Sequence, residues 1–346
     1  AIKFLVEDGR FDYIESGSLL GVRHKEVRSY PVGFEEPYQM YPMDLEEYLW
    51  ANGVQKSTIQ YLKDCYETGM PVTDAIHQTL CKLFYSYIVV GGMPDVVQTF
   101  VDTHDIAQVI ARQREVLELY RLDIAQYAQG SEKVKIRAIF DSIPSQLNDK
   151  KRRFVLAALD PNGRQLRYAD SFNWLCDAGV ALPCYNVEEP QPPLMLNEKR
   201  NLFKLFMGDT GLLCMENVQF EILNGDLQIN MGSILENAIA QQLKCNGFRL
   251  NYYDGKKTGE IDFVIQNGMG IELIEAKSGN DFRTHSAMDR IRKVEGWKFD
   301  KAVVLCKGNV EMLDGIWYYP WYMVMFLKSY QLPKELKYEI DLSALQ

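Results

Sequence analysis

Residues 259–279 read GEIDFVIQNGMGIELIEAKSG, and this stretch decides the fold expected for the second half of the chain. Two short apolar runs flank Asn267-Gly268, a dipeptide that strongly favours a β-hairpin. Side chains alternate between the two faces of a strand, so Glu275 and Lys277 share one face, and Asp262 points away from Phe263. Charges in an apolar hairpin are costly unless they are paired or hold a metal ion. We therefore take this hairpin as the candidate functional site.

A fourth candidate residue, Glu236, lies in the helix expected over residues 233–246. It borders an apolar stripe that contains Leu235 and Ile239, so it can face the sheet. Hydrolysis of a phosphodiester with Mg²⁺ needs carboxylates to hold the metal and a cation near the attacking water.

These requirements assign a role to each of the four residues. We expect Glu236, Asp262 and Glu275 to be Mg²⁺ ligands, and Asp262, Glu275 and Lys277 to be the catalytic groups. Lys277 would position or deprotonate the water, or stabilise the charge that develops on phosphorus.

A simpler interpretation of the hairpin charges remains open. In it, the carboxylates of Glu260, Asp262 and Glu275 are salt-bridge partners of nearby lysines, because ion pairs across a hairpin are common. The lysines available along the sequence are Lys256, Lys257 and Lys277.

Composition limits the classes of protein to which the chain can belong. Its 346 residues are enough for two or three domains, and its 47% hydrophobic content is ordinary for a globular protein. A net charge of −9 excludes a generic nucleic-acid binder, so contact with DNA would need a local basic patch. The seven cysteines are an odd number without a Cys-x-x-Cys pair, which favours a reducing cytosol, and we expect a cytoplasmic protein. No run of 18 apolar residues occurs, so we expect no membrane partner.

The first 50 residues combine a short helix, a strand expected over residues 12–14 and a polar turn that contains Ser16. A strand that ends in small polar residues is typical of the ligand-binding edge of a parallel sheet, although a plain loop fits equally well. Asp44, with Glu47 three residues later, predicts a capped helix. The start at Ala1, without a methionine, indicates a fragment whose true beginning lies upstream.

Helical periodicity dominates residues 55–130, and the next segment resembles a winged helix. Its helices are expected over residues 132–140, 150–159 and 167–178, followed by a β-wing. The main basic cluster of the chain falls here, and it would contact DNA phosphates or simply form a solvated face. The cluster consists of Lys150, Lys151, Arg152, Arg153, Arg164 and Arg167.

The residues Glu236, Asp262 and Glu275-Ala276-Lys277 resemble the restriction-endonuclease-like, or PD-(D/E)xK, signature. The longer pattern resembles a large prokaryotic family of AAA-type P-loop ATPases that end in a domain of unknown function with that fold. Residues 15–21 resemble the sensor strand of that family, with Ser16 as the nucleotide sensor. Residues 41–49 and 232–237 resemble two further segments of it.

The resemblance implies an α/β multidomain protein. Its parts would be the remnant of an ATPase core at 1–50, a helical lid at 51–130, a winged-helix domain at 131–215, an endonuclease-like domain at 216–330 and a tail at 331–346. No Gly-x-x-x-x-Gly-Lys-Ser/Thr motif and no Walker B strand occur, so ATP would bind only to the full-length protein.

Two functions follow from these expectations. The endonuclease-like domain would use Mg²⁺ to cut nucleic acid while the winged helix contacts DNA, or it would be a non-catalytic docking module for a protein partner of an ATP-driven remodelling machine. Simple DNA binding through the winged helix is a third option.

Overall fold

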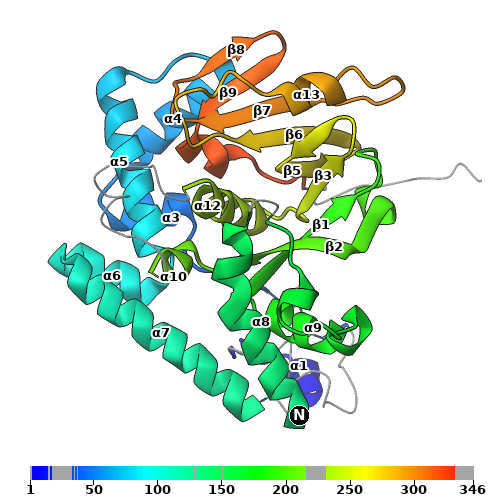
Figure 1. The fold of residues 1–346 in the computed structure, drawn as a ribbon. Helices are drawn as coiled ribbons and strands as arrows, with labels where there is room; N and C mark the ends of the chain where they lie inside the picture. The colour runs from blue at the N-terminus through cyan, green and yellow to red at the C-terminus, as the bar shows by residue number, and fades with distance from the viewer. Residues whose placement is uncertain are drawn as a thin grey trace, which may run out of the picture.

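The computed structural model describes residues 2–14, 16–17, 33–34, 36, 38–127, 130–149, 152–215 and 231–331 (Figure 1). It is a mixed α/β structure in which helices come first along the chain and two mixed sheets follow. The helices before the sheets are α1 (Ile2–Asp8), α3 (Leu45–Ala51), α4 (Lys56–Thr68), α5 (Asp74–Val90), α6 (Pro94–Thr103), α7 (Ile106–Tyr127), α8 (Gly130–Asn148) and α9 (Ala169–Asp177). The 3-10 turns η2 (Leu156–Ala158) and η3 (Gln165–Arg167) lie between α8 and α9.

Local sequence signals explain where several helices begin and end. The side chain of Asp44 accepts from Glu47 N, and the side chain of Glu47 accepts from Asp44 N, so the predicted capping box starts α3. Helix α4 ends at Gly69, whose φ of 75° suits a residue without a side chain. Helix α6 begins with Pro94 at its first position, where the missing N–H costs nothing.

The first sheet has four strands in the order β2-β1-β3-β4. Its strands are β1 (Ala181–Val187), β2 (Glu198–Met207), β3 (Asn251–Gly255) and β4 (Gly259–Ile261). Strands β1 and β2 are antiparallel, and β1 is parallel to β3 over Tyr185–Val187. The β1–β2 hairpin, expected as the wing of a separate winged-helix domain, therefore shares a sheet with two strands of the expected endonuclease-like domain.

The second sheet has five strands in the order β5-β6-β7-β9-β8. Its strands are β5 (Phe263–Asn267), β6 (Gly270–Ala276), β7 (Lys301–Cys306), β8 (Glu311–Leu313) and β9 (Ile316–Pro320). Strands β6, β7 and β9 are parallel, and β5 and β8 run antiparallel at the two edges. The remaining elements are α10 (Thr210–Met215), α12 (Met231–Cys245), α13 (Ser286–Ile291), η4 (Leu194–Asn197) and η5 (Trp321–Phe326).

Two apolar cores cover the two faces of the five-stranded sheet. The larger core contains Ile274 and Val303 together with Leu235 and Ile239 of α12, and it extends through the helical layer as far as Leu45. The smaller core contains Leu273 and Val304 together with Met288 and Ile291 of α13. Figure 1 shows α12 between this sheet and the β1–β2 hairpin.

Helix α12 also carries buried amide side chains that bind its neighbours. Asn237 accepts from Met207 N at 2.7 Å, Gln241 accepts from Thr210 N at 2.8 Å, and Gln242 accepts from Leu45 N at 2.9 Å. All three amides are buried, so these bonds replace those that water would make. They fasten α12 to the end of β2, to α10 and to the start of α3.

The structure changes three expectations about secondary structure. The hairpin at Asn267-Gly268 is confirmed, but its first run divides at Asp262 into β4 of one sheet and β5 of the other. The helix expected over 150–159 is wrong within the described residues, because Arg152 has a φ of 49° and only the 3-10 turn η2 forms. The strand expected over residues 12–14 is wrong as well, since the structure gives these residues no strand.

In the part of the chain that the structure describes, every helix is too short or too polar to traverse a lipid bilayer.

Gly211 gives a test of the close approach between α10 and α5. A Cβ atom there would lie 2.4 Å from Val90 O, and the helical backbone on both sides cannot move away cheaply. Alanine favours a helix over glycine by about 1 kcal/mol. Overpacking nevertheless costs about 1–3 kcal/mol, so we expect Gly211→Ala to lower the free energy of unfolding in urea.

Gly279→Ala is the matched control for this test. A Cβ atom at Gly279 meets nothing within 4 Å, so the change in stability should stay below about 0.5 kcal/mol. Equal stability of the two variants would contradict the close packing of α10 on α5.

Candidate functional site

Asp262 lies where the chain passes from the four-stranded sheet to the five-stranded sheet. The C-terminal end of strand β6 continues past Phe263, the first residue of β5, because Phe263 with Ile274 is the cross-strand pair at that end of the ladder. The carboxylate of Asp262 accepts from Ala276 N at 2.8 Å, beyond the end of that ladder. The Asp262 carboxylate therefore supplies the hydrogen-bond acceptor that a neighbouring strand would otherwise provide. This bond links β6 to the junction of the two sheets.

Glu275 and Lys277 follow on β6 and form an ion pair. Lys277 Nζ lies 2.9 Å from Glu275 Oε2, and the lysine side chain is 30% exposed while that of the glutamate is buried. Burial raises the pKa of Glu275, the Lys277 ammonium lowers it, and the negative charge of Asp262 raises it further. These three predicted catalytic residues are therefore neighbours in the structure.

Glu236 faces a different environment from Glu275. Alternation along β6 puts Glu275 on the face of Ile271 and Leu273, which pack with α13. Glu236 lies on α12, whose apolar residues pack with the other face of this sheet. Glu275 and Glu236, two of the three carboxylates expected to bind Mg²⁺, are thus on different faces of the sheet. Among the residues that the structure describes, no group of three or more His, Cys, Asp and Glu residues is placed to hold a metal ion.

Protein cations neutralise Glu236. Its carboxylate, 2% exposed, forms an ion pair with Arg152 and a second contact with Lys204 Nζ at 3.3 Å. Lys204 is completely buried, lies 2.6 Å from Glu260 Oε1 and sits over the ring of Tyr252 at 5.0 Å. Two carboxylates, a lysine and an arginine thus balance one another, with Glu236 and Lys204 buried and Glu260 and Arg152 partly exposed.

Lys204 is the residue of this site that the sequence analysis missed. It stands within the apolar strand run Phe203–Met207, and a single lysine in such a run signals a buried counter-ion. The simpler interpretation of the hairpin is correct for Glu275, which pairs with Lys277. It is wrong for Glu260, because Lys204 is its partner rather than Lys256 or Lys257.

A histidine also joins the neighbourhood of Glu275. His285, just before α13, has Nε2 2.6 Å from the hydroxyl of Tyr318 and Nδ1 3.1 Å from Asp289 Oδ1. It is buried, and its proximity lowers the pKa of Glu275. Burial raises the pKa of Tyr318, so this hydroxyl stays protonated at neutral pH.

The residues predicted to contact DNA phosphates differ in their exposure and in their ion pairs. Arg152 is paired with Glu236 and Arg153 with Asp254, so both guanidinium groups are engaged inside the protein. Arg167 is exposed at the end of η3, while Lys151 lies outside the described residues. Ser16, the expected nucleotide sensor, is exposed and belongs to no helix or strand.

These features define a mixed α/β protein with a charged site along the edge where its two sheets meet. Residues 231–323 match the family DUF4143, and residues 81–220 match the family DUF8612; both are described as domains of unknown function. Searches of the curated proteins and of the solved structures find no match.

The Asp262 junction predicts different effects for two substitutions. Asp262→Asn keeps an oxygen that accepts from Ala276 N, whereas Asp262→Ala leaves this N–H without its partner, a loss of about 1–3 kcal/mol. We expect the alanine variant to be clearly less stable than the asparagine variant in urea unfolding. Equal losses would mean that the charge of Asp262, and not the hydrogen bond, holds the junction.

Glu275 predicts a pH dependence of stability. Its pKa in the folded protein lies above the ordinary value of 4.5, so the folded state binds more protons than the unfolded state between the two values. The contribution of Glu275 is then largest at low pH and is lost as the pH rises through the folded pKa. Glu275→Gln removes this titration, so the stability of the wild type minus that of the variant should fall as the pH rises from 4.5. A difference that rises with pH would show that Lys277 outweighs burial.

Proposed function

We propose that the chain is the C-terminal part of an AAA-ATPase-associated protein, in which the PD-(D/E)xK-like half is a docking module for a protein partner. The match of residues 231–323 to DUF4143, a domain found in AAA-ATPase-associated proteins, supports the association. The order of Glu236, Asp262 and Glu275-Ala276-Lys277 supports an endonuclease-like origin for this half. ATP would act upstream, in the full-length protein, and would drive remodelling of the docked partner.

The ion pairs of Glu236 are the observation that favours docking over cleavage. A nuclease of this type would direct the helix carboxylate to Mg²⁺, but Arg152 and Lys204 hold it here. Removing one partner of a buried ion pair costs about 3–5 kcal/mol, so a metal ion would have to displace two cations at considerable cost. The same carboxylate therefore stabilises the fold and connects the segment after α8 to α12.

A second candidate function has one specific observation in its favour. Asp262, Glu275 and Lys277 are neighbours, and this is the catalytic part of the expected Mg²⁺-dependent nuclease. Exposed Arg167 would contact nucleic acid in that case. The engaged guanidinium groups of Arg152 and Arg153 support this candidate less.

A cleavage assay decides between the two candidates. The chain is incubated with Mg²⁺ or Mn²⁺ and plasmid DNA, single-stranded DNA or RNA, and calorimetry measures Mg²⁺ binding in parallel. We expect no cleavage above the background of the Lys277→Ala variant and no heat of Mg²⁺ binding, because Glu236 and Glu275 lie on different faces of the sheet.

The control for this assay is Lys298→Ala, which removes a lysine that is exposed in the structure. Cleavage by the wild type and by Lys298→Ala, lost in both Asp262→Ala and Lys277→Ala, would overturn the docking role and establish a nuclease.

A further inference from the structure

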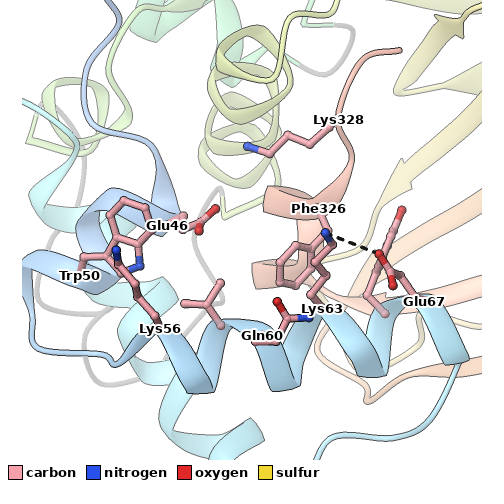
Figure 2. A pocket seen from close by; sticks show the side chains of 10 residues that line it. Glu46, Trp50, Lys56, Gln60, Lys63, Glu67, Phe326 and Lys328 are labelled. Atoms are coloured by element: carbon pink, nitrogen blue, oxygen red, sulfur yellow. Dashed lines mark ion pairs between the residues drawn. The ribbon is translucent and has the colours of Figure 1, made fainter. Parts of the chain in front are cut away.

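A hollow of about 420 Å³ lies between α3, α4 and the end of η5 (Figure 2). Its walls come from residues far apart in the sequence, since Trp50 lies on α3, Lys63 on α4, and Phe326 and Lys328 near the end of the described chain. The volume is within the range of about 300–1,000 Å³ that is usual for binding pockets. Neither the candidate site nor the predicted basic cluster contributes to its lining.

Apolar side chains form part of the lining of this hollow. Ile59 is buried on α4, and the ring of Tyr66 packs on the ring of Phe326 at 5.6 Å. Trp50 contributes a large ring that remains 44% exposed. Such a surface favours a large apolar side chain, whose burial is worth about 1.5–3 kcal/mol.

Three lysines line the same hollow, together with two glutamates. Lys63 pairs with Glu67 at 3.7 Å, and Lys328 lies 3.8 Å from Asp44, with lysine side chains that are 53% and 50% exposed. The Lys63–Glu67 pair is exposed on both sides and contributes little, so the Lys63 ammonium remains available to an incoming carboxylate. Lys328 Nζ also donates to Asn246 Oδ1 at 2.7 Å, which fixes its position, and an ammonium has three donors, so it can still bind a carboxylate. Figure 2 shows Lys328 on the side of the hollow opposite the α4 lysines.

The ring faces argue against the stacking of nucleic-acid bases in the hollow. Lys301 Nζ lies 4.5 Å from the centre of the Tyr66 ring, and Lys56 Nζ lies 5.9 Å from the centre of the Trp50 ring. Single-strand binders need open aromatic faces beside a uniformly positive groove. Here cations already lie over two of the rings, and the mixed lining of lysines and glutamates is not a uniformly positive groove.

We propose that this hollow docks an acidic peptide segment of a partner protein, with one large apolar side chain in contact with Ile59 and Phe326 and its carboxylates beside Lys56, Lys63 and Lys328. The inference rests on the docking role proposed above and names where the partner binds. Because α3 and α4 precede the sheets in the sequence while Phe326 follows them, a bound segment contacts elements on both sides of the sheets along the chain.

Selection from a library of short random peptides tests this proposal. The whole chain is the bait, and the double variant Lys56→Glu/Lys63→Glu provides the counter-selection. We expect the wild type to enrich peptides in which Asp or Glu flanks a large apolar residue, and the variant to lose them. The enriched peptide, measured by fluorescence anisotropy, should bind at least about tenfold more weakly to the double variant and more weakly in high salt.

The matched control is Lys293→Glu/Lys298→Glu, which makes the same change of charge at exposed lysines between α13 and β7. It should keep the affinity within about twofold, because long-range electrostatics between exposed charges are screened. Trp50→Ser tests the apolar wall without changing the charge, and it should also weaken binding. Thermal unfolding of each variant verifies that it is folded.

Several results would overturn the inference. They are the absence of enriched peptides, equal enrichment by the wild type and the Lys56→Glu/Lys63→Glu variant, and displacement of the peptide by single-stranded oligo-dT. These outcomes differ from the one that would overturn the docking role. That outcome is cleavage of nucleic acid that depends on Lys277, and it is measured in a separate assay. Absence of peptide binding at this hollow would leave the cleavage result unchanged.

Discussion

The position of α12 depends on hydrogen bonds from buried amides, and the rest of the structure is arranged around that helix. Asn237, Gln241 and Gln242 bind β2, α10 and α3, and the last of these bonds spans 197 residues of the sequence. Each bond contributes only about 0.5–1.5 kcal/mol net, but a buried group left without its partner costs about 1–3 kcal/mol. Apolar packing alone would let the helix rotate or slide, whereas these directional bonds admit one orientation. That orientation also directs Glu236 toward Lys204 and Arg152, away from Glu275.

The orientation of α12 helps to determine which partners the carboxylates of the PD-(D/E)xK-like pattern have. A helical Glu, a strand Asp and a Glu-x-Lys pair are compatible with a metal site and equally with a set of internal ion pairs. Here Lys204 neutralises Glu236 and Glu260 together, and Asp262 binds a backbone N–H. Residue types suited to catalysis thus hold two sheets and a helix together.

Local signals made much of the fold predictable. The hairpin dipeptide and the capping box at Asp44 determine structure through near neighbours, and both predictions are confirmed. The partners of Glu236 could not be predicted in the same way, because Lys204 lies 32 residues away and pairs only after the sheet and the helix have packed. The helix expected over 150–159 failed for a related reason. Its charged residues favour a helix locally, but Arg152 and Arg153 form ion pairs with distant carboxylates, and Arg152 has a left-handed backbone that no α-helix contains.

The parallel pairing of β1 with β3 has a consequence for how the two matched families relate. Strands β1 and β2 belong to the range that matches DUF8612, and β3 and β4 belong to the range that matches DUF4143, yet all four make one sheet. Separating the ranges would expose unpaired backbone along Tyr185–Val187 and Asn251–Tyr253, and such open edges promote aggregation. In this protein the two ranges therefore share one continuous sheet, although each is recognised separately.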